Sequence, residues 1–161
     1  MHNKKILFVC LGNICRSPAA EAIMKKKLKD ANLQDNVYVD SAGTAGYHEG
    51  DTADPRMIQH ASKRGYKIDH IARKFRSAKD FLTFDYIITM DDQNFAEVNS
   101  HDNIKKFGYK IFKMAEFCKK HDVSEVPDPY YEGDEGFEKV LDILEDGCSE
   151  LLEKIRHDIT T

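Results

Sequence analysis

Residues 5–18 read KILFVCLGNICRSP, and this stretch decides how the chain begins its fold. An apolar run ends at Cys10, five residues follow, and Arg16 comes next. The apolar run predicts a buried strand. Pro18 predicts the first turn of a helix, where the missing N–H of proline costs nothing. The stretch therefore predicts a strand, a tight loop and a helix in direct succession, which is how parallel α/β sheets are built.

The loop between this strand and helix has the composition of an anion-binding site. Gly12 and Asn13 turn the chain, so that successive backbone N–H groups face inward beside a helix N-terminus. Arg16 adds a planar guanidinium that matches two phosphate oxygens. Cys10 lies at the base of the loop, where the same positive field stabilises a thiolate. The candidate phosphate-binding residues are Leu11, Gly12, Asn13, Ile14, Cys15, Arg16 and Ser17.

The rest of the chain alternates apolar runs with helical patterns. Strands are predicted at 5–10, 37–41, 86–90 and 110–112, and helices at 18–32, 54–64, 91–100, 115–119 and 135–156. Strands that alternate with helices indicate a parallel sheet covered on both faces. Because no linker or repeat divides the 161 residues, we expect 1–161 to form a single domain. Ligands of such sheets bind beyond the carboxyl ends of the strands, which is where the Cys10 loop lies.

Composition limits the classes of partner. Hydrophobic residues make up 41% and charged residues 32%, which is typical of a soluble globular protein. The net charge of −4, without an obvious basic face, argues against nucleic acid and anionic membranes as partners. No stretch has membrane-spanning length, and the residues before the first strand lack an apolar secretory region, so we expect no secretory segment. Two of the four cysteines fall in the loop, which favours a reducing, cytoplasmic location. The His and Cys residues lack ligand spacing, so we expect neither metal nor cofactor.

The longest irregular region, 120–134, contains the candidate general acid. Asp128 stands between two prolines, which make a stiff, non-helical segment. Such an aspartate is either an ordinary turn residue or an acid that protonates a leaving oxygen, and a thiolate nucleophile nearby favours the acid. Tyr47, Tyr130 and Tyr131, together with Ile14, are candidates to line a slot for an aromatic ring.

Several polar residues have both a structural and a functional interpretation. Ser17 either caps the helix or donates a hydrogen bond to the Cys10 thiolate, and both roles are compatible. His70 is a candidate to orient the loop through Ser41 and Asn13. Asp91 follows the third strand and is expected to cap the next helix, while His48 is assigned no direct chemical role.

The other cysteines differ in their expected roles. Cys15 is either a small buried residue or a resolving thiol that traps oxidised Cys10 as a disulfide. Cys118 and Cys148 fall in helical patterns and are expected in the core.

Over essentially its whole length the chain resembles the low-molecular-weight protein tyrosine phosphatases. The resemblance rests on VCLGNICRSP at 9–18, DSAGT at 40–44, DPR at 54–56, MD at 90–91 and DPYY at 128–131. It implies a flavodoxin-like, four-stranded parallel sheet with helices on both faces. It implies Cys10 as nucleophile, Arg16 as phosphate and transition-state binder, and Asp128 as general acid and then base. Ser17 would stabilise the thiolate, with Asn13, Ser41 and His70 in support.

The resemblance also implies phosphotyrosine-containing proteins as substrates, and inorganic phosphate or other oxyanions as inhibitors. Three alternatives differ in chemistry. Arsenate reductases of similar fold use a further cysteine pair, whereas 80–92 here contains no cysteine and Cys118 and Cys148 are far apart in sequence. Protein-arginine phosphatases carry Thr where this chain has Ile14, and an apolar Ile suits an aryl phosphate better. A non-catalytic oxyanion-binding or phosphotyrosine-binding module would have no need of Asp128 as an acid.

Overall fold

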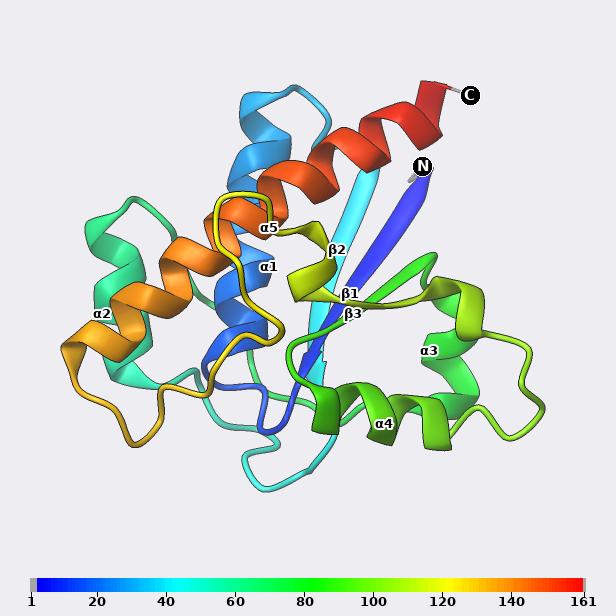
Figure 1. The fold of residues 1–161 in the computed structure, drawn as a ribbon, viewed down its shortest axis with the longest axis horizontal. Helices are drawn as coiled ribbons and strands as arrows, with labels where there is room; N and C mark the ends of the chain where they lie inside the picture. Colours follow the sequence, from blue (N-terminus) through cyan, green and yellow to red (C-terminus); the bar gives the residue numbers. More distant parts are fainter. Residues whose placement is uncertain (1–2, 161) are drawn as a thin grey trace.

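The computed structural model describes residues 3–160 and contains a sheet of four parallel strands (Figure 1). The strands are β1 Lys4–Cys10, β2 Val37–Gly43, β3 Tyr86–Thr89 and β4 Ile111–Lys113. Their order across the sheet is β2-β1-β3-β4, so β1 lies at the point where the strand order reverses. Cys10 of β1 pairs with Gly43 of β2, and Val9 pairs with Thr89 of β3. The carboxyl ends of these strands therefore meet at one edge, and the predicted parallel sheet is confirmed.

Helices cover both faces of the sheet because alternate residues of β1 point to opposite sides. Ile6 and Phe8 pack in a core with α1 Arg16–Asp30, α2 Pro55–Lys63 and α5 Asp134–Thr160. Leu7 and Val9 pack in a second core with α3 Ser77–Thr83 and α4 Asp92–Ser100. Figure 1 shows the same division, with α1, α2 and α5 on one side of the strands and α3 and α4 on the other. The predicted α/β architecture, with helices on both faces, is confirmed.

Most predicted elements lie within a residue or two of their expected bounds, and the exceptions are α3, α5 and the region of the predicted helix at 115–119. Helix α3 was not predicted, because in its seven residues only Asp80 and Phe81 are buried and no apolar period can repeat. The predicted helix at 115–119 is a 3-10 turn, Met114–Phe117, and α5 extends beyond the predicted 135–156. Strand β4 begins one residue late, because Lys110 ends a 3-10 turn, Gly108–Lys110.

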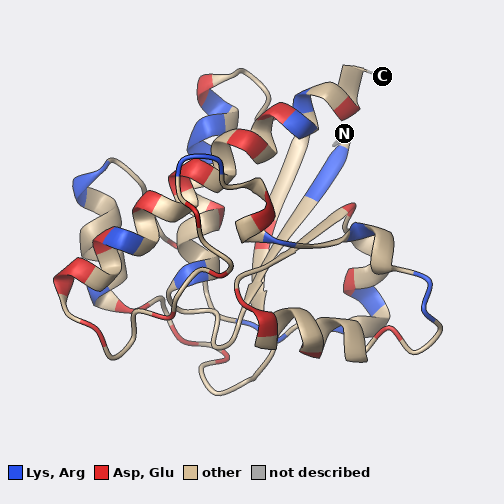
Figure 2. Cartoon of the chain, in the orientation of Figure 1, with Lys and Arg blue, Asp and Glu red and all other residues tan. Residues whose placement is uncertain are grey.

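The surface is mixed in charge. Figure 2 shows both charges along α5, where acidic residues predominate and Lys139, Lys154 and Arg156 are the basic ones. Within residues 3–160, no helix combines the length and the apolar character needed to cross a membrane.

Candidate active site

The loop between β1 and α1 directs its carbonyl groups away from its own centre. Thr44 N–H donates to the Cys10 carbonyl at 2.9 Å, and Ala45 N–H donates to the Leu11 carbonyl at 3.0 Å. Asp54 N–H donates to the Ile14 carbonyl at 2.9 Å. Among residues 3–160, by contrast, no backbone carbonyl accepts a hydrogen bond from the N–H groups of 11–15. The loop thus presents free donors at the N-terminus of α1, which is the arrangement that binds an anion.

Two residues permit this tight path. Asn13 adopts a left-handed conformation with φ of 59°, which asparagine tolerates better than most residues. Gly43, at the end of β2, lies directly under the loop, and a Cβ there would come within 2.7 Å of the Leu11 carbonyl oxygen. The loop can therefore lie on the end of β2 only because Gly43 has no side chain.

The Cys10 thiol is buried and belongs to a chain of polar side chains. Ser17 Oγ lies 3.0 Å from Cys10 Sγ. Asn13 Nδ2 donates to Ser17 Oγ at 2.8 Å and to Ser41 Oγ at 3.0 Å. Since the hydroxyl oxygen of Ser17 already accepts from Asn13, its hydrogen is left to donate, either to Sγ at 3.0 Å or to the Ala42 carbonyl at 3.5 Å. The N-cap position of α1 is Cys15 and Ser17 lies inside the helix, so Ser17 is not its cap, and the expected contact with the thiol is the one that the structure shows.

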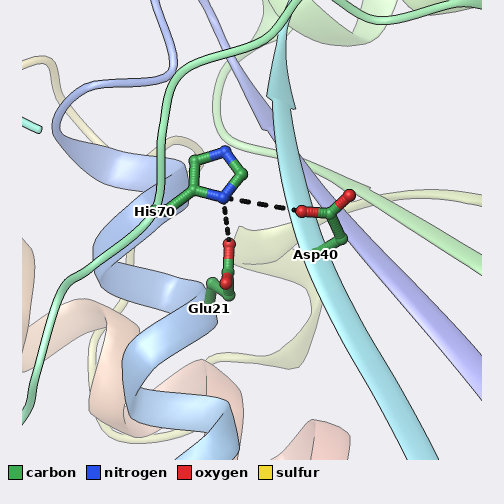
Figure 3. A group of neighbouring side chains, drawn as sticks. All are labelled: Glu21, Asp40 and His70. Carbon is green, nitrogen blue, oxygen red and sulfur yellow. Dashed lines mark ion pairs between the residues drawn. The ribbon is translucent and has the colours of Figure 1, made fainter. Parts of the chain in front are cut away.

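The side-chain amide of Asn13 is held in one orientation from behind the loop. Its Oδ1 accepts from His70 Nε2 at 2.8 Å and from Arg73 N–H at 2.9 Å. His70 Nδ1 lies 3.2 Å from Glu21 Oε1 and 3.5 Å from Asp40 Oδ1 (Figure 3). Because both ring nitrogens face oxygen acceptors, only the doubly protonated imidazole donates to both sides. The structure thus brings together the predicted group of Ser17, Asn13, Ser41 and His70.

The Glu21, Asp40 and His70 group has oxygen and nitrogen atoms close enough to hold a metal ion. Its carboxylates are already paired, however, with Lys25 at 2.6 Å from Glu21 and Arg73 at 3.1 Å from Asp40. Ser41 Oγ also donates to Glu21 at 2.7 Å. Because two cations compensate the two carboxylates, we interpret the group as a support for the loop.

Arg16 is buried at the start of α1 and is held by two other segments. Its NH1 donates to Asp91 Oδ2 at 2.7 Å and to the Val126 carbonyl at 3.0 Å, while NH2 lies 3.6 Å from Asp128 Oδ2. Burial opposes the positive charge, but the negative charges of Cys10, Asp91 and Asp128 outweigh it and raise the pKa of Arg16. Arg16 therefore stays charged, with an orientation that other parts of the chain determine.

Asp91 is a functional candidate that sequence reasoning underestimated. Its Oδ1 accepts from Asn94 N–H at 2.7 Å, which is the expected helix cap of α4. Its other oxygen holds Arg16. The position of Asp91, just past the carboxyl end of β3, was the available signal, because ligands of parallel sheets bind at that edge.

A cavity of about 270 Å³ opens above the loop. It is lined by Cys10, Leu11, Gly12, Ile14, Cys15, Arg16, Tyr47, His48, Asp128, Tyr130 and Tyr131. Asn13 and Ser17, which were expected among the phosphate-binding residues, do not line it, and their side chains support the loop from behind. Asp128 faces Cys10 and Arg16 across this cavity, with its side chain 45% exposed.

The predicted aromatic residues lie at the mouth of the cavity. Tyr47 is 78% exposed and Tyr131 is 96% exposed, whereas Tyr130 is 38% exposed. His48, which was given no role, lies against Gly12, where an added Cβ would come within 3.1 Å of its Cδ2. His48 therefore belongs to the cavity wall, although nothing in the local sequence distinguishes it from other loop histidines.

The remaining cysteines differ in environment. Cys15 is buried in the loop, and its burial, together with the charge of Asp54, raises the pKa of its thiol. Cys148 is fully buried in the core, as expected. Cys118 is only partly buried and packs at the edge of that core, because it follows a 3-10 turn and is not part of a helix.

A thiol at the floor of a loop of free N–H groups, on a parallel α/β sheet, defines a class of oxyanion-binding proteins with a cysteine beside the anion. The family description "Low molecular weight phosphotyrosine protein phosphatase" matches residues 5–161. The human protein of that name is 40% identical over 152 residues, which cover 94% of this chain and 95% of the human protein. The chain belongs to this family, whose named members are protein-tyrosine-phosphatases.

Solved structures agree with this assignment. A protein tyrosine phosphatase from Entamoeba histolytica, crystallised with Hepes in its active site, has a TM-score of 0.93 and 50% identity. That match covers 96% of this chain and 98% of the other. A Drosophila arginine phosphatase has a TM-score of 0.87 and 34% identity, covering 94% and 97% of the two chains. The fold is thus shared by proteins named for different phosphoryl substrates.

Proposed function

We propose that this chain hydrolyses phosphotyrosine in proteins, and small aryl phosphates, through a cysteinyl-phosphate intermediate. The observation that carries the proposal is the cavity shared by Cys10, Arg16 and Asp128, above a loop with free N–H donors. Phosphotyrosine-containing proteins are then the substrates, and inorganic phosphate and similar oxyanions are inhibitors. The loop N–H groups and Arg16 bind the phosphoryl oxygens.

In the first step the Cys10 thiolate attacks phosphorus in line with the leaving oxygen. A sulfur–phosphorus bond forms, the phosphorus–oxygen bond breaks, and protonated Asp128 gives its proton to the leaving tyrosyl oxygen. In the second step Asp128, now a carboxylate, takes a proton from water as the water oxygen attacks phosphorus. The sulfur–phosphorus bond breaks and the thiolate returns. Preorganised charge and positioning supply most of the rate gain in such a loose transition state.

Preference for aryl phosphates is supported by the residues that line the cavity and its mouth. Ile14 lines the cavity, and Tyr47, Tyr130 and Tyr131 surround its mouth. A phosphotyrosine ring spans from the loop to these residues, whereas the side chain of phosphoserine is too short to reach them while its phosphate contacts Cys10. Aromatic contacts add about 0.5–1.5 kcal/mol beyond buried area.

The same site is expected to respond to oxidants. Burial raises the pKa of Cys15, so its thiol has to give up its proton as its sulfur attacks an oxidised Cys10. Peroxide would oxidise Cys10 to a sulfenic acid. Attack by the Cys15 sulfur would then form a disulfide and release water.

The test compares kcat/KM for phosphotyrosine, phosphoserine and phosphoarginine peptides and for arsenate reduction, in the presence of a chelator. We expect phosphotyrosine to be preferred. Equal or better turnover of phosphoarginine would replace the proposal with arginine-directed activity, and arsenate reduction would replace it with the reductase.

Two variants test the mechanism itself. Cys10→Ser should abolish hydrolysis but keep oxyanion binding, since the loop donors and Arg16 remain. Asp128→Ala should lower kcat/KM by about 10²–10⁴-fold for poor leaving groups and much less for activated ones. Equal losses with good and poor leaving groups would remove Asp128 from the acid role.

A further inference from the structure

Asp128 has few contacts of its own. Its Oδ1 accepts from Tyr130 N–H at 3.1 Å, its Oδ2 lies 3.6 Å from Arg16, and almost half of its side chain is exposed. Residues 127–133 form neither helix nor strand. Upstream this segment is anchored at Val126, whose N–H donates to the Met90 carbonyl at 2.8 Å. The orientation of Asp128 therefore depends on what holds the downstream end, from Tyr130 to the start of α5.

Helix α2 supplies that downstream anchor, and it is also tied to the phosphate-binding loop. Asp54, the cap of α2, donates its N–H to the Ile14 carbonyl. Its carboxylate binds Arg56 through Nε at 3.1 Å and NH2 at 2.7 Å. The guanidinium of Arg56 in turn lies 5.3 Å from the centre of the Tyr130 ring and 4.9 Å from that of Phe137. Arg56 thus connects the loop side of α2 with the residue that hydrogen-bonds Asp128.

One turn further along α2, His60 contacts the first turn of α5. His60 is buried, and its ring stacks on Phe137 with centres 5.5 Å apart and planes 4° apart. Its Nδ1 lies 2.5 Å from Glu138 Oε2 and its Nε2 lies 3.1 Å from Asp134 Oδ1. Both acceptors are carboxylates, so His60 donates to both only when both ring nitrogens carry hydrogen. Figure 1 shows α2 beside the beginning of α5, where the segment that carries Asp128 ends.

We propose that His60, together with Arg56, positions the general acid by fixing the segment from Tyr130 to Asp134 against α2. This inference rests on the proposed function, because it assigns a positioning role toward the same Asp128. His60 is not among the residues that line the cavity above Cys10, so its role would be exerted through the segment. Losing the contact lets Asp128 leave its position above the leaving oxygen, while Cys10 and Arg16 keep theirs.

Removal of the His60 contact should therefore lower kcat/KM by an amount that depends on the leaving group. Removal of a general acid costs about 10²–10⁴-fold in rate. Loss of the His60 contact, with the Arg56 contact kept, should cost about 5- to 20-fold in kcat/KM for a poor leaving group. An activated leaving group needs little protonation and should show less than about a twofold change.

Asp134 is a better residue to substitute than the buried His60, because its side chain is 91% exposed and its removal should not disturb the core. Asp134→Ala removes the His60 contact, whereas Asp134→Asn keeps an oxygen acceptor for it. Glu135→Ala is the matched control, since Glu135 is an exposed acid in the same turn of α5 that forms no ion pair or hydrogen bond to α2 within residues 3–160. His60→Phe keeps the ring on Phe137 and removes both polar contacts.

The experiment measures kcat/KM for a series of aryl phosphates from phenyl to dinitrophenyl leaving groups. We expect Asp134→Ala and His60→Phe to lower kcat/KM for phenyl phosphate but not for dinitrophenyl phosphate. Asp134→Asn should recover the wild-type kcat/KM, and Glu135→Ala should leave it unchanged. Equal activity of Asp134→Ala and wild type, or an equal loss in Glu135→Ala, would overturn the positioning role. Asp128→Ala is measured in the same series, so failure of Asp128 as acid is distinguished from failure of the anchor.

Discussion

The Asp91→Asn substitution tests the contact between Asp91 and Arg16 separately from the helix cap, because the Asp91 carboxylate accepts hydrogen bonds from both groups. In the wild type Oδ1 accepts from Asn94 N–H and Oδ2 accepts from Arg16 NH1. Asparagine has a single side-chain oxygen, so it can serve either the α4 cap or Arg16, and its NH₂ then faces the other donor. Asparagine is a good helix cap. We therefore expect the cap to survive and the contact with Arg16 to be lost.

The size of the effect follows from the burial of Arg16, whose side chain is 3% exposed. A hydrogen bond to a charged group is worth about 1.5–3 kcal/mol. The Val126 carbonyl still holds the guanidinium, but NH1 loses its charged partner. If all of this free energy is lost from the stabilisation of the transition state, kcat/KM falls about 10- to 150-fold, because each factor of ten corresponds to about 1.36 kcal/mol.

The assay pairs steady-state kinetics on an aryl phosphate with urea unfolding. Asn94→Ala is the control, because it breaks the reciprocal Asp91 N–H contact to Asn94 Oδ1 at 3.3 Å without touching Arg16. It should lower stability and leave kcat/KM nearly unchanged. The reasoning is refuted if Asp91→Asn keeps full activity, or if Asn94→Ala loses as much activity as Asp91→Asn.

Three further predictions concern other parts of the chain. Mild peroxide should inactivate the enzyme and a thiol reductant should restore it, and peptide mapping should find a Cys10–Cys15 disulfide; irreversible loss with only sulfonic acid at Cys10 would contradict this. Tyr47→Ala should narrow the preference for aryl over alkyl phosphates by lowering kcat/KM for the aryl substrate, and an unchanged ratio would remove Tyr47 from recognition. Burial alone would raise the pKa of Asp146, but backbone N–H groups of 119–121 outweigh it and lower the pKa. Its contribution to stability is therefore present above the unfolded value of about 3.9 and lost as pH falls through the folded value. Asp146→Asn should accordingly unfold at lower urea than wild type at pH 7, with the difference shrinking in acid, and a constant difference would refute the assignment.

Local patterns were sufficient to predict the fold because its strands are short apolar runs and its longest helix is strongly periodic. The left-handed conformation at Asn13 also follows from local chemistry, whereas α1 begins at Arg16, two residues before the predicted start at 18. Helix α3 could not be predicted, since its burial comes from packing on Phe75 and Phe107, which lie outside it.

The residues of the candidate site likewise include some that the local sequence predicts and some that it does not. The spacing after the first strand predicts the roles of Cys10 and Arg16, and the two flanking prolines single out Asp128. The second contact of Asp91 and the wall position of His48 depend on tertiary distances that no local pattern encodes. Likewise the exposure of Tyr47 and Tyr131 reflects how far their loops extend over the cavity, which composition does not report.

The partners that hold the phosphate-binding loop come from distant parts of the chain. Asn13 meets Ser41 across 28 residues and His70 across 57, while Arg16 meets Asp91 across 75 and Val126 across 110. Each of these contacts requires closing a long loop, and such contacts form slowly compared with local helices. The strand and turn that carry the nucleophile are local, but their working geometry exists only after the whole sheet has assembled. Recovery of oxyanion binding during refolding should therefore coincide with the slowest tertiary phase, which makes ligand binding a reporter of complete folding.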